Sequence, residues 1–387
     1  MIFFSMKQLL VTLSFMFSLI SSFVFAAPSL IPAAPQLSAS SYILMDAYTG
    51  DVLVEHNADE ALPPASLTKL MTAYIIEYEL ARGNLRFDDK VSISEKAWRM
   101  EGSRMFIREG TQVSLEDLMR GIIIQSGNDA SIAAAEHIAG SESAFADLMN
   151  QHAQLLGMTN SRFVNSTGFP AENHYSTAHD LAKLSRATIL QFPENYKMYS
   201  EKYFTYNDIR QPNRNKLLWR DKTVDGLKTG HTNAAGYCLA ASAVRNGTRL
   251  ITVVMGTKSD EARAAEAQKL LDYGFRYYET RKLYSRGQVV NNAHVWGGSQ
   301  STVKVGFAND VLVTMPRQQG ASLPATLDMQ SDIVAPVSVG DVLGKIIVGT
   351  EGGVLLERSV VALETVEEGG FFKRMFDKIK RFFSNLF

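Results

Sequence analysis

The sequence is poor in cysteine and has no excess of either charge. Cys238 is the single cysteine in 387 residues, so the chain cannot form an internal disulfide. It lies in an apolar, strand-like run over 237–240, which predicts a small buried side chain rather than a reactive thiol. The 39 lysines and arginines nearly balance 40 aspartates and glutamates. This balance excludes the overall basic character of many nucleic-acid-binding proteins, so we expect no nucleic-acid partner.

Long apolar runs are also missing after the N-terminal segment. No later stretch approaches the roughly 18 apolar residues that a membrane-spanning helix requires. The N-terminal segment has a basic residue, Lys7, an apolar stretch over 9–20, and small residues at Val24 and Ala26. This pattern predicts a signal peptide over residues 1–26, removed by cleavage after Ala26, and therefore an exported protein. An uncleaved membrane anchor is the alternative interpretation of the same segment.

The chain up to about residue 281 alternates between strand and helix patterns. Four runs have the composition and turn signals of strands: 42–46, 52–55, 236–244 and 249–256. Helical patterns are found at 67–75, 114–124, 129–138 and 262–277. Strands at both ends with helices between them predict an α+β domain over 27–281, in which helices flank an antiparallel sheet.

The pattern of apolar and turn-forming residues changes from about residue 282. Short alternating runs separated by turn signals predict a small all-β domain over 282–368. These runs lie at 288–290, 302–305, 311–315, 345–348 and 354–357. The segment has no cluster of residue types that commonly carry catalysis, so we expect the chemistry to lie in the first domain.

Three short motifs in the first domain carry chemically useful side chains. Ser66 to Lys69 fit S-x-x-K, Ser126 to Asn128 fit S-x-N, and Lys228 to Gly230 spell K-T-G. The first two patterns are weak alone, because residue usage predicts roughly one chance occurrence of each in a chain of this length. Their order along the chain and the local structure predicted around each one indicate that they belong to one catalytic site.

The S-x-x-K motif follows two prolines and is predicted to open a helix, where amide groups favour developing negative charge. Lys69 then lies one turn from Ser66 on the same helix face. A lysine that is partly desolvated beside another cation can lose its proton and act as a base. The S-x-N motif is predicted to lie in a loop between helices. The K-T-G motif is predicted to precede a strand directly, with Gly230 allowing a substrate backbone to approach closely.

These motifs resemble those of the penicilloyl-serine transferases, the group that contains penicillin-binding proteins and serine β-lactamases. The surrounding sequence is similar to the type-5 low-molecular-mass penicillin-binding proteins. That similarity is dense over roughly residues 40–280 and includes these segments: 42–50, 64–72, 102–106, 177–182 and 225–232. The resemblance implies a β-lactamase-like catalytic domain, and the β domain and basic tail resemble the family's C-terminal parts in kind and order.

The resemblance implies a serine D-alanyl-D-alanine carboxypeptidase that acts on peptidoglycan peptides ending in D-Ala-D-Ala. Ser66 would attack the carbonyl of the penultimate D-Ala and form an acyl-enzyme, Lys69 would act as its base, and Ser126 would relay a proton to the departing D-Ala. Water would then release the acyl group without a metal or cofactor. A β-lactam would mimic the substrate and leave a slow acyl-enzyme.

The same resemblance assigns substrate binding to the other motif residues. Asn128 would bind the peptide or position Lys69. Lys228 would lower the pKa of Lys69 and attract the terminal carboxylate, with Thr229 hydrogen-bonding that carboxylate and Gly230 beside it. Backbone amides of Ser66 and His231 would form the oxyanion hole. Arg263 is a further candidate for holding the carboxylate.

The last residues form a basic amphipathic segment. Phe371–Phe387 places apolar, mostly aromatic residues along one helical stripe and five basic residues opposite, after a Gly369-Gly370 joint. It is too polar to span a bilayer and suits a helix lying at a membrane surface. We expect residues 369–387 to tether the exported enzyme to the periplasmic face of the bacterial inner membrane. A helix packed on the protein or on a partner is the alternative.

Other functions share parts of this pattern. Separately, Ser66 could be a helix cap, Lys69 a solvated lysine, and Lys228 to Gly230 a turn. A class A-like β-lactamase shares S-x-x-K and K-T-G, but needs fast deacylation, and we find no glutamate loop of that type before Lys228. A non-catalytic penicillin sensor would not require the base and relay groups. A D,D-endopeptidase would use the same site on cross-linked peptides.

Overall fold

The computed structural model describes residues 31–317, 323–350 and 353–384. The predicted signal peptide, residues 1–26, lies outside the described residues, as do the last three residues of the predicted tail.

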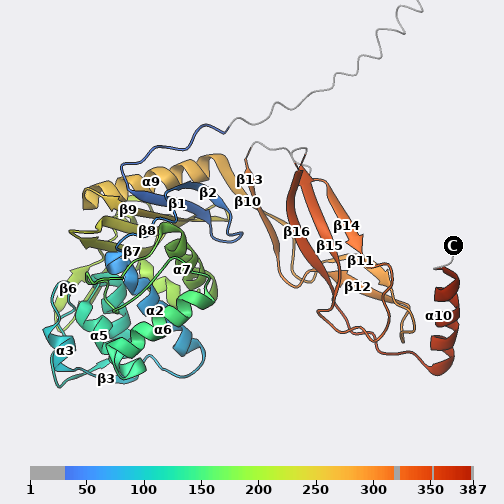
Figure 1. The fold of residues 1–387 in the computed structure, drawn as a ribbon, viewed down its shortest axis with the longest axis horizontal. Coiled ribbons are helices and arrows are strands. Elements are labelled where there is room, and N and C mark those ends of the chain that lie inside the picture. The colour runs from blue at the N-terminus through green and yellow to red at the C-terminus, as the bar shows by residue number, and fades with distance from the viewer. Residues whose placement is uncertain (1–30, 318–322, 351–352, 385–387) are drawn as a thin grey trace, which may run out of the picture. The chain divides into compact units, whose positions relative to one another are not determined.

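A five-stranded antiparallel sheet organises the first part of the chain (Figure 1). In spatial order its strands are β2 (Val52–His56), β1 (Ser41–Asp46), β9 (Thr248–Thr257), β8 (Gly236–Arg245) and β7 (Val224–Thr232). The first four were each predicted from alternation and turn signals, and the structure confirms them. β7 forms one edge of the sheet, pairing only with β8 among the described strands.

The two faces of this sheet carry two separate hydrophobic cores. Leu44 and Leu250 point to one face, which is covered by helix α9 (Asp260–Tyr277). Their neighbours Ile43 and Ile251 point to the opposite face and pack against the helical part of the domain. Figure 1 shows α9 on one side of the sheet and, on the other side, α2 (Lys69–Ala81), α5 (Asn128–Ala139), α6 (Glu142–Leu155) and α7 (Ala178–Gln191). Because successive side chains of a strand point to opposite faces, neighbouring residues of the same strand contribute to the two different cores.

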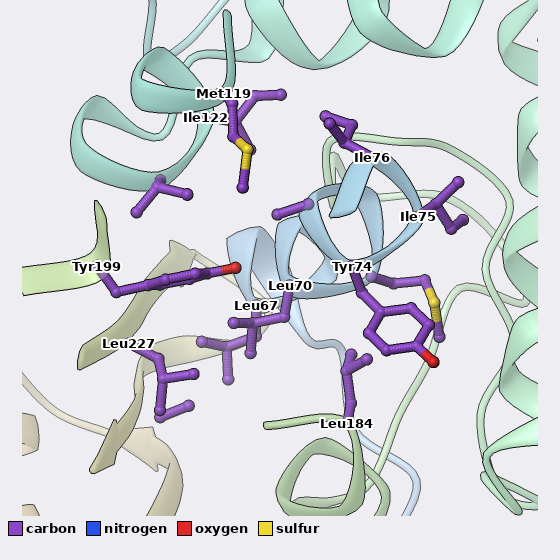
Figure 2. Close-up of a cluster of buried hydrophobic side chains, with 14 of the residues drawn as sticks. Leu67, Leu70, Tyr74, Ile75, Ile76, Met119, Ile122, Leu184, Tyr199 and Leu227 are labelled. Atoms are coloured by element: carbon purple, nitrogen blue, oxygen red, sulfur yellow. The ribbon is translucent and has the colours of Figure 1, made fainter. Parts of the chain in front are cut away.

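Helix α2 (Lys69–Ala81) runs through the middle of the helical part. Its first nine residues are buried, so it is surrounded by protein rather than half-exposed. The apolar stripe predicted at 67–75 is buried as expected. Figure 2 shows Leu70 and Tyr74 of α2 among side chains from distant segments, including Leu184, Tyr199 and Leu227.

Besides α2 and α9, the described first part of the chain contains nine helical segments. They are η1 (Ala65–Thr68), α3 (Glu95–Arg99), α4 (Leu115–Arg120), η2 (Gly121–Gln125), α5 (Asn128–Ala139), α6 (Glu142–Leu155), α7 (Ala178–Gln191), η3 (Asn195–Ser200) and α8 (Leu217–Arg220). Of these, η1, η2, α5, α6 and α7 contact α2. Two small hairpins accompany them: β3 (Lys90–Ser92) with β4 (Gln112–Ser114), and β5 (Tyr203–Tyr206) with β6 (Ile209–Pro212). The predicted cap at Ser114 is confirmed, because its Oγ accepts from the Asp117 N–H at 3.1 Å.

The predicted all-β region is confirmed as a second set of strands with a core of its own. β10 (Tyr278–Tyr284) pairs with β13 (Val311–Pro316). A separate sheet has the order β11 (Val289–His294), β12 (Thr302–Gly306), β16 (Gly353–Ala362), β15 (Val342–Thr350) and β14 (Ala325–Met329). The predicted boundary between residues 281 and 282 falls within β10, so the chain passes from one part to the other along a strand.

Helix α10 (Phe371–Ser384) follows the β strands, where the amphipathic segment was expected to be helical. None of the helices in the described ranges has both the length and the apolar character needed to cross a bilayer.

Candidate active site

Ser66 lies in the short 3₁₀ turn η1, directly before α2 rather than within it. The preceding residue, Ala65, has a positive φ of 49°, a conformation that side chains other than glycine adopt only when the surroundings impose it. Leu67 and Thr68 are buried, whereas Ser66 is partly exposed. The turn is therefore anchored by its neighbours while the serine hydroxyl stays accessible.

Lys69 is almost completely buried, with 1% of its surface exposed. Its Nζ donates to three oxygens: Ser66 Oγ at 3.2 Å, Asn128 Oδ1 at 2.7 Å and the Thr167 carbonyl at 2.6 Å. These partners fix the nitrogen beside the serine. A neutral amine held here has a lone pair within reach of the Ser66 hydroxyl proton, which is the geometry that a general base requires.

Burial, and next the positive charge of Arg214, lower the pKa of Lys69 from 10.5 to about 7. The acidic groups of Asp129 and Glu142 act in the opposite direction. The resemblance implies Lys228 for this effect, and that role stays a prediction. Arg214 is a further cation, missed by the sequence analysis, whose charge lowers the pKa of Lys69. Repulsion between the two lysines adds to burial in lowering the pKa of Lys228 well below its usual value.

Ser126 and Asn128 enter the site where the π turn η2 meets α5. Ser126 takes the left-handed conformation, with φ 66° and ψ 36°, and ends the turn. Its Oγ is buried and has no hydrogen-bond partner among the described residues. The Asn128 Nδ2 donates to the Glu101 carbonyl at 2.6 Å, which orients the amide so that its oxygen faces Lys69. The S-x-N motif therefore supplies one fixed amide and one hydroxyl for which the described part of the chain offers no partner.

The K-T-G motif lies within edge strand β7, not ahead of a strand as predicted, because β7 extends from Val224 to Thr232. Gly230 lies against η1: a Cβ there would be 3.1 Å from the Pro64 carbonyl oxygen and 3.2 Å from the Ser66 nitrogen. A side chain at this position would crowd Ser66. Lys228 is buried, and its Nζ donates to the Thr229 carbonyl at 2.9 Å.

Arg263, on α9, contacts strand β7, and His231 is a residue of β7 itself. The Arg263 Nη1 donates to the Gly230 carbonyl at 2.9 Å, and its guanidinium lies 5.5 Å from the ring of Tyr237. The His231 ring stacks on Tyr237 with centroids 3.9 Å apart. Arg263 thus contacts the backbone of the K-T-G strand. Its contact with a substrate carboxylate stays a prediction.

Arg214 is a cation of the site that the sequence analysis missed. It lies between two buried asparagines whose amides donate to backbone carbonyls, Asn213 to Glu201 at 3.0 Å and Asn215 to Gly226 at 2.9 Å. Its charge lowers the pKa of both Lys69 and Lys228. The only sequence signal is the Asn-Arg-Asn triplet, which matches none of the three motifs.

A loop over residues 164–168 was also missed. Asn165 Oδ1 accepts from the Gly168 N–H at 2.7 Å and closes the loop on itself. Thr72 Oγ1 of α2 donates to the Ser166 carbonyl at 2.7 Å, one residue before the carbonyl that meets Lys69. A Cβ on Gly168, whose φ is +78°, would lie 1.8 Å from the Ala65 carbonyl oxygen. This loop therefore presses directly against the turn that carries Ser66.

The arrangement combines the parts needed for acyl transfer. An accessible hydroxyl lies beside a lysine of low pKa, and a second hydroxyl, that of Ser126, has no hydrogen-bond partner among the described residues. Two arginines lie close to β7: the charge of Arg214 lowers the pKa of Lys228, and Arg263 donates to the Gly230 carbonyl. Such a site can form an ester on the serine and attract a carboxylate.

Comparisons with known proteins agree with this chemistry. The family model described as D-alanyl-D-alanine carboxypeptidase matches residues 29–259, and that of the penicillin-binding protein 5 C-terminal domain matches residues 278–368. The chain is 43% identical to the D-alanyl-D-alanine carboxypeptidase DacC of Escherichia coli over 371 residues, 94% of this chain and 92% of that protein.

Solved structures are similar over most of the chain. Penicillin-binding protein 5 from Haemophilus influenzae has a TM-score of 0.81 at 40% identity, covering 87% of this chain and all of that one. Penicillin-binding protein D2 from Listeria monocytogenes, solved in the ampicillin-bound form, has a TM-score of 0.58 at 32% identity, covering 62% of this chain and all of that one. The predicted resemblance and fold class are confirmed.

Proposed function

The chain belongs to the D-alanyl-D-alanine carboxypeptidase family and is a serine-type enzyme of this class, and we propose that Ser66 is the residue it acylates. The observation that carries the proposal is the 3.2 Å contact between Ser66 Oγ and the Nζ of buried Lys69. With a pKa of about 7, Lys69 is partly neutral at physiological pH and can accept the serine proton. No other described residue contacts that hydroxyl in the same way.

In the first half of the reaction, Lys69 takes the proton of Ser66 Oγ as the oxygen attacks the carbonyl carbon of the penultimate D-Ala. The backbone amides of Ser66 and His231 stabilise the negative charge that develops on the carbonyl oxygen. The amide C–N bond then breaks, and the departing nitrogen takes a proton through Ser126, whose Oγ has no partner among the described residues. Terminal D-Ala leaves, and the rest of the peptide is an ester on Ser66.

In the second half, water attacks the ester carbonyl and the bond to Ser66 Oγ breaks. Lys69 lies where it can take the water proton and return one to the serine, which restores the starting state. A β-lactam follows the first half by opening its ring on Ser66, but its leaving group stays attached, so the acyl-enzyme is slow to hydrolyse.

The charges of the site favour a substrate with a free carboxylate at its end. Arg214 and Arg263 bring positive charge to the K-T-G strand, to which Lys228 adds when it is protonated, and we expect the Thr229 side chain to hydrogen-bond the carboxylate. This supports cleavage at the terminus of a pentapeptide ending in D-Ala-D-Ala. The near full-length similarity to a carboxypeptidase ranks this function above a β-lactamase or a D,D-endopeptidase.

The test is release of D-Ala from a peptidoglycan pentapeptide by purified protein. Ser66→Ala should lower the rate at least roughly a thousandfold, since the nucleophile acts only in the chemical step. The control is Ser143→Ala, which removes an exposed hydroxyl on α6 and should leave the rate unchanged. Equal release by wild type and Ser66→Ala would remove Ser66 from the mechanism.

The exposed face of α10 supports a second proposal, that this helix binds a membrane surface. Its aromatic residues Phe371, Phe372 and Phe376 are exposed. Its polar side contacts the β domain instead: Asp377 accepts from the Gly297 N–H at 3.0 Å, and the Arg381 guanidinium pairs with Asp332. A helix held by its polar side leaves its apolar side available to acyl chains.

On this proposal, the exported enzyme lies on the periplasmic face of the inner membrane, with its peptide substrates in the same compartment. Binding to vesicles of mixed anionic and neutral lipid is the measurement. Deleting Phe371–Phe387 or introducing Phe372→Glu and Phe376→Glu should abolish sedimentation with vesicles while D-Ala release continues. Trp98→Glu, at an exposed aromatic residue of α3, is the control and should not change sedimentation. Undiminished binding after the deletion would contradict the proposal.

A further inference from the structure

His174 connects the loop at residues 164–168 to the turn that carries the nucleophile. Its Nε2 lies 2.8 Å from Thr68 Oγ1, and the Val164 N–H donates to its Nδ1 at 3.2 Å. Because Nδ1 accepts from an amide, Nε2 carries the ring proton and donates to Thr68. One neutral ring therefore uses both nitrogens to join two segments that lie about a hundred residues apart in the sequence.

The environment of the ring keeps it neutral. His174 is 6% exposed, and burial, then the charge of Lys69, lower its pKa to about 4. Phe163 covers it edge-on, with centroids 5.9 Å apart. Protonation would remove the acceptor that Val164 requires and would add a second cation beside Lys69. The bridge is therefore intact over the pH range in which Lys69 titrates.

The bridge lies at the base of the loop that reaches Lys69. Arg162 and Tyr175 exchange backbone hydrogen bonds at 2.9 and 3.0 Å, which closes the segment between them. His174 then ties the beginning of the enclosed loop to Thr68. Further along, Thr72 Oγ1 meets the Ser166 carbonyl and Lys69 Nζ meets the Thr167 carbonyl. One residue of η1, Thr68, and two residues of α2, Lys69 and Thr72, thus hold one short loop.

We propose that His174 is a positioning residue for acylation, which keeps the Thr167 carbonyl on Lys69 Nζ by fixing the loop to Thr68. The proposal rests on the proposed function of Ser66 and Lys69. His174 is not a second base, because it contacts neither Ser66 Oγ nor Lys69 Nζ by a hydrogen bond. It acts through the loop, and its loss should affect the step in which Lys69 takes the serine proton.

Removing the ring leaves the buried Thr68 hydroxyl and the half-buried Val164 amide without these partners, which is unfavourable for both groups. The loop relieves this cost by moving toward water, and the Thr167 carbonyl moves with it. Lys69 then loses one of its three acceptors and its fixed direction toward Ser66. Misdirection of a catalytic group by about 1 Å lowers rates by as much as about a hundredfold.

The experiment compares second-order rate constants for acylation by a fluorescent penicillin at pH 7.5. His174→Leu removes both hydrogen bonds and should slow acylation about tenfold to a hundredfold. His174→Gln supplies an amide oxygen for Val164 and an amide N–H for Thr68, and should stay within about threefold of wild type. The matched control is His152→Leu, since His152 is 4% exposed and packs edge-on against Tyr78 without a bridging role.

His152→Leu should lower the thermal unfolding temperature while acylation stays near the wild-type rate. Acylation at the wild-type rate by His174→Leu would overturn the proposal. Equal slowing by His174→Gln and His174→Leu, or by His152→Leu, would also overturn it, since it would show a general loss of packing. If His174→Leu does not fold, Thr68→Val decides: it keeps the shape and removes Oγ1, and an unchanged rate would overturn the proposal.

Wild-type labelling separates this proposal from the proposed function. If mass spectrometry finds no penicillin adduct on Ser66 of the wild type, the proposed function fails. If the adduct forms on Ser66 and the His174 variants acylate normally, only the positioning role fails.

Discussion

The pH dependence of acylation should report the pKa of Lys69 directly. The base must be neutral to accept the Ser66 proton, so the rate should rise with pH through about 7 and level off above it. With a pKa of about 7, the neutral fraction rises roughly tenfold between pH 6 and pH 8. An ordinary lysine, with a pKa of 10.5, would leave the rate rising far into the alkaline range.

The size of the effect follows from the same values. A pKa lowered from 10.5 to about 7 corresponds to destabilising the ammonium form by roughly 5 kcal/mol, at 1.36 kcal/mol for each tenfold change. Burial supplies the largest part and the charge of Arg214 the next. Removing that charge should favour the ammonium form, raise the pKa of Lys69 and move the midpoint to higher pH. A midpoint one pH unit higher would lower the neutral fraction at pH 7 about fivefold.

The assay is the acylation rate constant for a fluorescent penicillin from pH 5 to pH 10, in wild type, Arg214→Met and Arg214→Lys. The midpoint should rise in Arg214→Met and stay close to wild type in Arg214→Lys, which keeps the charge. Arg220→Met is the control: this exposed arginine pairs with Glu261, away from Lys69. Comparing midpoints separates the effect on Lys69 from any loss of substrate affinity. A wild-type midpoint near 10, or one that does not move in Arg214→Met, would refute the reasoning.

Three other substitutions test the packing and chemistry around the site. Gly168→Ala should destabilise the protein and abolish penicillin labelling, because its Cβ would lie 1.8 Å from the Ala65 carbonyl oxygen. The control is Gly157→Ala, which is also at positive φ but has open space around it. It should lower the free energy of unfolding, measured by chemical denaturation, by only about 1 kcal/mol. Burial raises the pKa of Glu77 well above 4.5, so the folded chain keeps a proton that the unfolded chain loses, and the free energy of unfolding should fall as pH rises above 4.5. Glu77→Met should therefore raise the thermal unfolding temperature more at pH 8 than at pH 5, and an equal gain at both would show that Glu77 is ionised in the folded state. Ser126→Ala should slow D-Ala release about a hundredfold or more if its hydroxyl relays the proton, as measured with the pentapeptide, and a normal rate would exclude that role.

Much of the fold could be predicted because its signals are local. Alternating apolar residues and tight turns predict the strand pairs of the sheet. Short, regularly spaced strand patterns predict the β domain. Ser66 and Lys69 were found because their spacing of three residues matches their proximity in space, and Asn128 was found because it belongs to the S-x-N motif. The K-T-G motif was predicted to precede a strand, but it lies within β7. The length of β7 depends on its pairing with β8 rather than on its own residues.

The missed parts of the site depend on contacts between distant segments. The Thr167 carbonyl is a backbone group, so no residue type marks it as a partner of Lys69. Arg214 acts through its position, which two asparagines set by bonding to other segments. His174 has the sequence environment of any loop histidine, and its two partners are identified only once the chain is folded. Short motifs thus locate the reacting groups but not the groups that tune them.

The most direct test of the account is to map the covalent adduct. Purified protein is incubated with benzylpenicillin, digested, and examined by mass spectrometry for the acylated peptide. The account predicts one adduct, on the peptide that contains Ser66, and none in Ser66→Ala. An adduct on Ser126 or another residue, or an unchanged adduct in Ser66→Ala, would contradict it.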